Sequence, residues 1–186
     1  MKPEEKARVK IDQWLTEAGW KVINRDEFEA DSNAVAVREA LLKGNKEADY
    51  FLFINGMAVG VLEAKREEID VAQQIVCDQA EGYARGVPSY YTAYQKPLPF
   101  IYTSNGKHHY CRDYRKKDST YEEISVMHKP KKLTEMLGIE DPFAGLPTLN
   151  PKGLRACQYE AITGLEKSFR NGQNRALMVL ATGAGK

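Results

Sequence analysis

The segment DYFLFINGMAVGVLEAK, residues 49–65, restricts the possible folds of this chain more than any other. Two apolar runs flank Asn55-Gly56, a preferred dipeptide for a tight turn between antiparallel strands. These runs are apolar enough to lie inside a sheet, so the sequence predicts a central β-hairpin. The first run nevertheless begins with Asp49, and the second ends with Glu63 and Lys65. Burying a charged group in a central strand is energetically unfavourable, so such residues indicate a paired or functional role.

The spacing of these charged residues suggests a metal-dependent hydrolytic site. Glu63 and Lys65 are two apart in a strand and point to one face, while Ala64 points to the other. Phosphodiester hydrolysis near neutral pH requires a hard divalent cation, carboxylates that hold it and a source of hydroxide. Asp49, Glu63 and the main-chain carbonyl of Ala64 can hold Mg²⁺, and Lys65 can meet the attacking water or the developing phosphate charge. The alternative is a solvated strand face with a weak ion pair, because Glu-x-Lys is a common sequence.

The metal-site hypothesis places a condition on the strand register. With regular pairing through a two-residue turn, Asp49 would lie opposite Leu62, and the Asp49 and Glu63 side chains would point to opposite faces. We therefore predict a three-residue loop with a glycine bulge, or another β-bulge, that shifts the register by one residue.

Hydrophobic periodicity predicts an alternation of helices and strands along the rest of the chain. Residues 34–42 are ambiguous between a helix and a strand, and the early break at 43–45 favours the strand. A Pro- and Gly-rich stretch, 141–153, is typical of a linker. The expected helices are 3–18, 70–85, 131–138 and 155–170, and the further strands are 20–24, 34–42, 99–106, 107–114 and 176–180.

Composition excludes several classes of protein. The chain has no uninterrupted apolar run of about 18 residues and no basic-then-apolar leader, which predicts a cytoplasmic protein with no membrane partner. Its three cysteines, Cys77, Cys111 and Cys157, are widely spaced and odd in number, as expected for reduced thiols. The net charge of +1 does not favour general polyanion binding. The basic residues between 107 and 117 form either a local nucleic-acid patch or a solvated loop.

The segments EADYFLFINGMAVGVLEAKRE, QAEGYARG and FIYTSNG resemble the N-terminal nuclease domain of the motor (R) subunit of type I restriction enzymes, in the PD-(D/E)xK nuclease superfamily. The resemblance implies an α/β fold with a restriction-endonuclease-like core, in which helices flank a mixed central β-sheet. It also implies that Asp49, Glu63 and Lys65 are catalytic. The proline of the superfamily motif is replaced here by Ala48.

Two further sets of residues follow from this resemblance. Gln79 and Tyr83 match a Gln-x-x-x-Tyr pair on the helix after the catalytic strand, which contacts DNA or supports the site; otherwise they form a polar helix edge. Glu17 is a candidate for an additional metal ligand on the first helix, where Glu4, Glu5 and Asp12 compete with it.

The last segment, LRACQYEAITGLEKSFRNGQNRALMVLATGAGK, resembles the start of a RecA-like superfamily 2 helicase motor. A glycine-rich loop binds phosphates through its main-chain N–H groups, and a lysine meets the β and γ phosphates. A flexible glycine-rich tail is the alternative. The chain has neither the Ser or Thr that would hold Mg²⁺ nor the Walker B acid, so we expect a fragment that does not hydrolyse ATP. The nucleotide-binding residues implied are Gln158, Thr182, Gly183, Ala184, Gly185 and Lys186.

The sequence therefore predicts a nuclease domain at 1–140, a linker at 141–153 and a truncated motor at 154–186. The resemblance implies Mg²⁺-dependent cleavage of double-stranded DNA by a type I site-specific deoxyribonuclease. Its R subunit would translocate DNA with ATP and act with modification and specificity subunits. Two alternatives remain open: an inactive nuclease-fold scaffold that binds DNA, and a repair or junction nuclease, each fused to a helicase.

Overall fold

The computed structural model describes residues 3–29, 33–42, 44, 46–139, 149–170 and 176–185. The chain divides into two compact units, Met1–Leu133 and Thr134–Lys186. Residues 141–148 of the predicted linker lie outside the described residues, and the predicted domain boundaries at 140 and 153 stay predictions.

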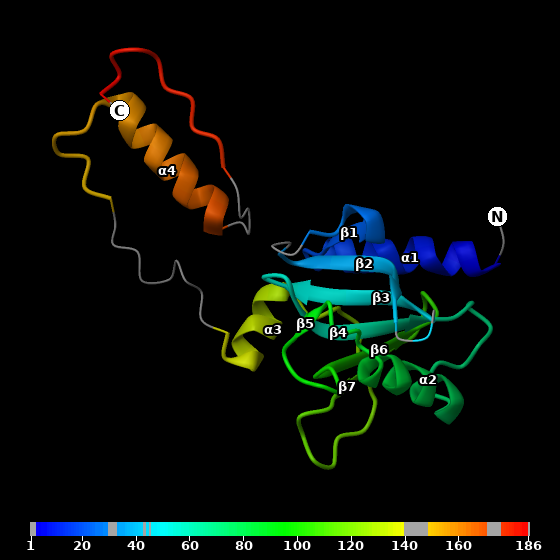
Figure 1. Ribbon diagram of the computed structural model, residues 1–186. Helices are drawn as coiled ribbons and strands as arrows, with labels where there is room; N and C mark the ends of the chain where they lie inside the picture. Colours follow the sequence, from blue (N-terminus) through cyan, green and yellow to red (C-terminus); the bar gives the residue numbers. More distant parts are fainter. Residues whose placement is uncertain are drawn as a thin grey trace. The chain divides into compact units, whose positions relative to one another are not determined.

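The first unit is built on one mixed β-sheet (Figure 1). Its order is β1-β2-β3-β4-β6-β7-β8, and the short β5 also pairs with β4. Strand β4 is antiparallel to β3 and parallel to β6, so the predicted hairpin lies in the middle of the sheet. The strands are β1 (Lys21–Asn24), β2 (Val35–Leu41), β3 (Glu47–Ile54), β4 (Met57–Ala64), β5 (Thr92–Ala93), β6 (Phe100–Ser104), β7 (His109–Asp113) and β8 (Glu122–Glu123).

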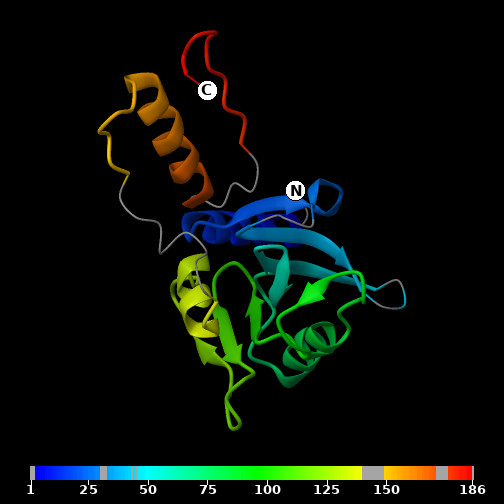
Figure 2. The ribbon, with the colours of Figure 1, turned by 60° about the vertical axis from the view of Figure 1, so that its left-hand side comes forward.

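Two helices cover opposite faces of this sheet, as Figures 1 and 2 show. Helix α1 (Pro3–Glu17) buries Ile11 and Leu15, and its Asp12 accepts a 2.8 Å hydrogen bond from the Tyr50 hydroxyl on β3. Helix α2 (Gln74–Arg85) contributes Ala80 and Ala84 to the core that contains Phe51, the next residue on β3. Because successive strand residues point to opposite faces, Asp49 belongs to the face covered by α2.

The predicted register shift is present in the β3–β4 hairpin. Ile54 pairs with Met57 across a two-residue turn at Asn55-Gly56, where both φ angles are positive. The pairing then shifts between Leu52 and Phe53, so that Leu52 lies opposite Gly60 and Tyr50 opposite Leu62. A β-bulge at Val59 accounts for the shift, and continuing the register places Asp49 opposite Glu63. The structure thus confirms the condition that the metal-site hypothesis required.

Several other predicted elements are confirmed, with changes at their ends. Residues 34–42 form a strand, and the strand pair predicted at 99–114 is β6 and β7. Helix α2 begins at Gln74 instead of residue 70, because the Asp70 carboxylate accepts a hydrogen bond from the Ala72 N–H and forms a turn there. The predicted short helix is α3 (Pro130–Leu137), and a 3₁₀ turn, η1 (Arg25–Glu27), follows β1.

The second unit contains α4 (Ala156–Arg170), close to the predicted helix at 155–170. The strand predicted at 176–180 is absent: these described residues are irregular, and Leu177 and Val179 are largely exposed. A strand requires a neighbour for its hydrogen bonds, and no described segment pairs with this one. No helix in the described ranges is long and apolar enough to cross a membrane.

Candidate active site

Asp49, Glu63 and Lys65 line one open pocket of about 540 Å³ at the end of the central hairpin. Strand β3 supplies Asp49 at its start, and β4 supplies Glu63 and Ala64 at its end. Helix α2 closes one wall with Gln79 and Tyr83, and α1 contributes Arg8. The structure therefore brings together the three predicted catalytic residues and the predicted Gln-Tyr pair.

Glu63 is the most deeply buried charged group in this pocket, with a residue exposure of 1%. Its Oε1 accepts a hydrogen bond from the Lys65 ammonium, while its Oε2 is buried without a hydrogen-bond partner among the described residues. Burial, and after it the charge of Asp49, raise the pKa of Glu63 to about 7, although the Lys65 ammonium opposes the rise. The pocket therefore holds a carboxylate oxygen with no hydrogen-bond partner in the described part of the chain.

Lys65 links the acidic strand end to α2. Its ammonium donates to Glu63 and, at 2.9 Å, to Oε1 of Gln79. Gln79 in turn donates from Nε2 to the Tyr83 hydroxyl, one helical turn away. Burial raises the pKa of the Tyr83 hydroxyl, with a contribution from the Glu63 charge. These contacts support a positioning role for Gln79 and Tyr83: they hold the lysine beside the carboxylate.

Each carboxylate oxygen of Asp49 accepts a hydrogen bond. The Arg8 guanidinium donates to Oδ1 at 2.8 Å, and the Ala64 main-chain N–H donates to Oδ2 at 2.8 Å. The second contact ties β3 to the end of β4 and holds the Ala64 peptide beside the carboxylate. Arg8 also donates to Glu39 on β2 at 2.8 Å.

The donor set of the pocket suits a hard divalent cation. Mg²⁺ prefers oxygen ligands and is often bound by one or two protein carboxylates together with water and substrate oxygens. The unpartnered Glu63 Oε2 and the adjacent Asp49 carboxylate are ligands of this kind. No group of three or more His, Cys, Asp or Glu side chains is arranged for a metal anywhere in the described residues. A third protein ligand would therefore come from the main chain, as predicted for Ala64.

Glu17 is not part of this pocket. It lies nine residues after Arg8 on α1, about 13 Å further along the helix axis at 1.5 Å per residue. Its carboxylate accepts a 2.7 Å hydrogen bond from Gln13, one turn earlier on the same helix. The geometry gives no support to Glu17 as an additional ligand, because Arg8 is the residue of α1 that lines the pocket.

Arg8 and Glu39 are the residues of this region that sequence reasoning missed. Arg8 lies in a helix rich in charged residues, and Glu39 lies in the stretch that was ambiguous between helix and strand. No local motif marks either residue. The available signal was the register of three strands, since Glu39, Asp49 and Glu63 follow one another across β2, β3 and β4.

The basic residues between 107 and 117 are partly neutralised by acidic neighbours. Arg112 donates to Glu81 at 2.6 Å, and Arg115 donates to Asp113 at 2.8 Å. These pairs tie β7 to α2 and to its own turn, which favours the solvated-loop alternative over a nucleic-acid patch.

In the second unit, the predicted nucleotide-binding residues lie partly together. Gln158 on α4 donates from Nε2 to the Gly185 carbonyl at 2.5 Å, and Arg155 donates to the Gly183 carbonyl. Both glycines have left-handed φ angles, 82° and 77°. Lys186 lies outside the described residues. Thr182 and Ala184 lie in the same loop as these glycines.

The fold and pocket define a mixed α/β protein with two carboxylates and a lysine at the end of its central hairpin. The family model for the second domain of the type I restriction enzyme EcoKI endonuclease subunit matches residues 24–137, which include the hairpin and α2. The chain belongs to this family of type I restriction enzyme endonuclease subunits.

Two individual proteins resemble the chain. The type I restriction enzyme EcoKI endonuclease subunit of Escherichia coli (strain K12) is 28% identical over 238 aligned positions, covering 98% of this chain and 20% of that protein. The chain thus spans about a fifth of the length of this curated relative. A fragment structure assigned to an HsdR subunit of a type I restriction enzyme from Vibrio vulnificus YJ016 is 25% identical, with a TM-score of 0.49, covering 100% of this chain and 36% of the other.

Proposed function

We propose that the first unit is a Mg²⁺-dependent nuclease domain with a restriction-endonuclease-like core, which cleaves double-stranded DNA as part of a type I restriction enzyme. One observation carries the proposal: Asp49, Glu63 and Lys65 converge in a single pocket, and the buried Oε2 of Glu63 has no partner among the described residues. An ordinary solvated Glu-x-Lys pair would keep its carboxylate in water. Family membership supports the same assignment.

Each residue has a defined role in this proposal. Asp49, Glu63 and the Ala64 carbonyl would hold the metal ion. Bound Mg²⁺ supplies Lewis acidity and lowers the pKa of a coordinated water. Lys65, whose ammonium lies beside Glu63, would orient the attacking water, and its charge would oppose the negative charge that develops on the phosphate. Gln79 and Tyr83 fix the position of Lys65 through the hydrogen bonds described above.

We propose further that residues 154–186 begin a RecA-like motor domain. The contacts from Arg155 and Gln158 to the glycine-rich loop support this, because they attach the proposed adenine-reading helix to the proposed phosphate loop. In the intact subunit the motor would bind ATP and translocate DNA, with modification and specificity subunits as partners.

The decisive experiment uses the intact endonuclease subunit assembled with its partner subunits. Supercoiled plasmid cleavage and ATP turnover are measured for wild type, Glu63→Ala and Lys65→Ala, with and without Mg²⁺. Loss of a metal ligand or of the lysine should reduce cutting at least about 100-fold, as expected for removal of a group that acts in the transition state. ATP turnover should stay within about two-fold of wild type.

The control is Glu122→Ala, an exposed glutamate on β8 outside the pocket, which should cut normally. Continued cutting by Glu63→Ala would exclude this site. A wild-type complex that binds DNA without metal-dependent cutting would support the inactive-scaffold alternative. Cutting of branched DNA by the subunit without its partners would support the repair or junction nuclease.

A further inference from the structure

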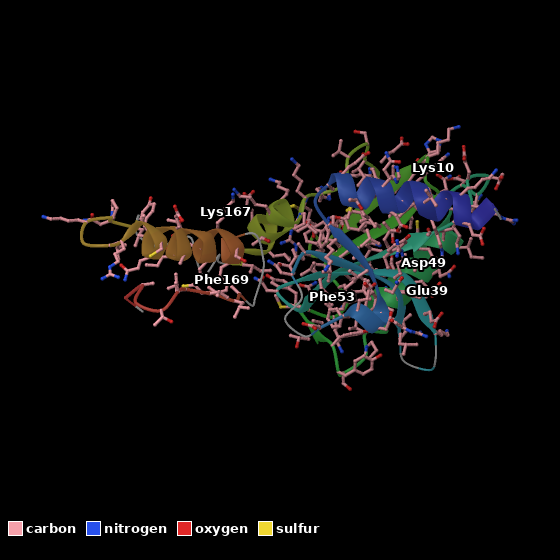
Figure 3. All side chains as sticks on the ribbon, turned by 90° about the horizontal axis from the view of Figure 1, so that it is seen from above. Lys10, Glu39, Asp49, Phe53, Lys167 and Phe169 are labelled. Carbon is pink, nitrogen blue, oxygen red and sulfur yellow. The ribbon has the colours of Figure 1, made fainter. Side chains whose placement is uncertain are left out.

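Arg8 joins two carboxylates on neighbouring strands at the mouth of the pocket. Its Nη1 donates to Glu39 Oε1 and its Nη2 donates to Asp49 Oδ1, both at 2.8 Å. Figure 3 shows Glu39 and Asp49 at the same end of the sheet, with Phe53 toward the other end. The side-chain exposures are 40% for Arg8, 54% for Glu39 and 18% for Asp49. The guanidinium therefore lies between an exposed and a mostly buried acid.

The strand register explains why these groups meet. On β2 and β3, Arg38 pairs with Tyr50 and Ala40 with Ala48, so Glu39 lies opposite Asp49. Glu39 has a φ of 51°, a left-handed conformation that is uncommon for a residue with a side chain. Such a conformation persists where surrounding contacts over-determine it, and it is a reason to look for a role. Here the Glu39 carboxylate forms an ion pair with Arg8.

Arg8 and a metal ion would compete for the same carboxylate, that of Asp49. Arg8 donates to Asp49 Oδ1 and the Ala64 N–H donates to Oδ2, so each oxygen already accepts one hydrogen bond and has a single lone pair left for a metal ion. The other proposed metal ligand, Glu63 Oε2, has no hydrogen-bond partner in the ranges that the structure describes. A divalent ion bound between these carboxylates would also repel a guanidinium in contact with Asp49.

We propose that Arg8 is a built-in competitor of the metal: it neutralises Asp49 while the site is metal-free and yields Asp49 to Mg²⁺, with Glu39 retaining the displaced guanidinium. This inference rests on the proposed function, since it takes Asp49 as a metal ligand. Arg8 and Glu39 are then positioning residues that set the metal affinity of the site without binding the metal.

The test is Mg²⁺ titration of the 186-residue chain by isothermal calorimetry, with no DNA and no activity readout. Arg8→Gln should bind Mg²⁺ about 5- to 10-fold more tightly than wild type, because the competitor is gone. Glu39→Gln should bind it about 2- to 5-fold more weakly, because Arg8 then has only Asp49. Lys10→Gln is the matched control: it removes a cation from the same helix whose partner, Glu67, is outside the pocket, and should change affinity less than two-fold.

The double variant Arg8→Gln/Glu39→Gln distinguishes two effects of Glu39. One is indirect, through the competition of Arg8 with Mg²⁺ for Asp49, and the other is the direct attraction of Mg²⁺ by the Glu39 charge. If Glu39 acts through Arg8, the Mg²⁺ affinity of the double variant should equal that of Arg8→Gln within about two-fold. If Glu39→Gln weakens binding equally with and without Arg8, the inference is overturned. It is also overturned if Arg8→Gln binds Mg²⁺ no more tightly than wild type.

Two further variants make the result independent of folding defects and of the proposed function. Arg8→Lys keeps a cation but cannot bridge both acids in the same fork, so its affinity should lie between those of wild type and Arg8→Gln; an affinity outside this interval contradicts the inference. Glu63→Ala should abolish Mg²⁺ binding. If wild type binds Mg²⁺ and Glu63→Ala does not, unexpected affinities in the Arg8 and Glu39 variants refute only the proposal that Arg8 competes with the metal. If wild type does not bind Mg²⁺, the proposed metal site and the proposed competition both fail.

Discussion

At the scale of single residues, the chemistry depends on a carboxyl group that is almost completely buried. Glu63 is 1% exposed, and neither Lys65 nor the neighbouring strands fully offset the removal of its charge from water. The result is a pKa of about 7 against an ordinary value of 4.5. The ionised Glu63 side chain is therefore electrostatically unfavourable in this central strand, and a bound cation would stabilise it.

This cost predicts a pH-dependent stability for the metal-free chain. Because the folded state raises the pKa of Glu63, its contribution to stability is fully present below the unfolded value and is lost as the pH rises through about 7. The variant Glu63→Gln is neutral at every pH and lacks this loss. Its unfolding free energy relative to wild type should therefore rise by about 1 to 3 kcal/mol between about pH 5 and pH 8.

Urea denaturation in a chelating buffer measures this difference. Mg²⁺ should reduce the pH dependence of wild type and leave Glu63→Gln unaffected, since the variant lacks a metal ligand. A stability difference that is constant with pH would show that Glu63 is not the titrating group.

The same scale shows where sequence reasoning succeeded and where it did not. Asp49, Glu63 and Lys65 stand in a recognisable order around a turn dipeptide, so their meeting could be predicted. Arg8 lies 41 residues before Asp49 in the sequence, and no local pattern specifies which acid an exposed helical arginine will contact. The sequence favours Glu17 over Arg8 as a site residue of α1 for the same reason, since the rotation and position of this helix over the sheet depend on tertiary packing.

At the scale of elements, the site depends on the bulge in β4. The bulge aligns Asp49 with Glu63, and the chain continues from it through Gly60, which lies against β6. A Cβ atom at Gly60 would lie 2.9 Å from the Phe100 carbonyl oxygen and 3.2 Å from Leu52 Cδ1. The sheet can accept no side chain at this position without moving.

Two glycine substitutions test the element that carries the site. Gly60→Ala should destabilise the chain by about 1 to 3 kcal/mol and weaken Mg²⁺ binding, because β4 must shift away from β6. Gly82→Ala is the control: it lies on the exposed side of α2, has no atom within 4 Å of the added Cβ, and should stabilise the helix by about 0.5 to 1 kcal/mol. Urea denaturation and Mg²⁺ titration measure both effects. Equal stabilities for the two variants would contradict the close packing of β4 against β6.

The ends of helices and strands depend on side-chain hydrogen bonds and strand pairing, which hydrophobic periodicity does not specify. Residues 70–73 carry the helical spacing predicted for 70–85, yet the Asp70 side chain forms a turn that delays the start of α2 to Gln74. Residues 176–180 are as apolar as a buried strand, yet without a pairing partner among the described residues they stay irregular. Apolar composition predicts burial only where a surface exists to receive it.

At the scale of the whole molecule, the chain divides into units that should be separable. The sheet, its two covering helices and the pocket all belong to the unit Met1–Leu133. We therefore predict that a chain truncated after Ile139 retains the unfolding free energy of the first unit and its Mg²⁺ affinity. Thermal unfolding and calorimetry of both lengths measure this; a fall of more than about 4 °C in the unfolding midpoint, equivalent to about 1 kcal/mol, would show that residues 140–186 contribute to its stability.

The sequence by itself determined the local elements: a central hairpin around Asn55-Gly56, its acidic and basic ends, and the helix that presents Gln79 and Tyr83. These follow from turn preference and side-chain periodicity, which act over a few residues. The tertiary structure alone decided that Arg8 and Glu39 meet Asp49, that Glu63 Oε2 has no partner among the residues that the structure describes, and that Glu17 stays outside the pocket. The reason is that burial and charge pairing depend on how α1 and three strands pack together, and that packing is a property of the assembled sheet.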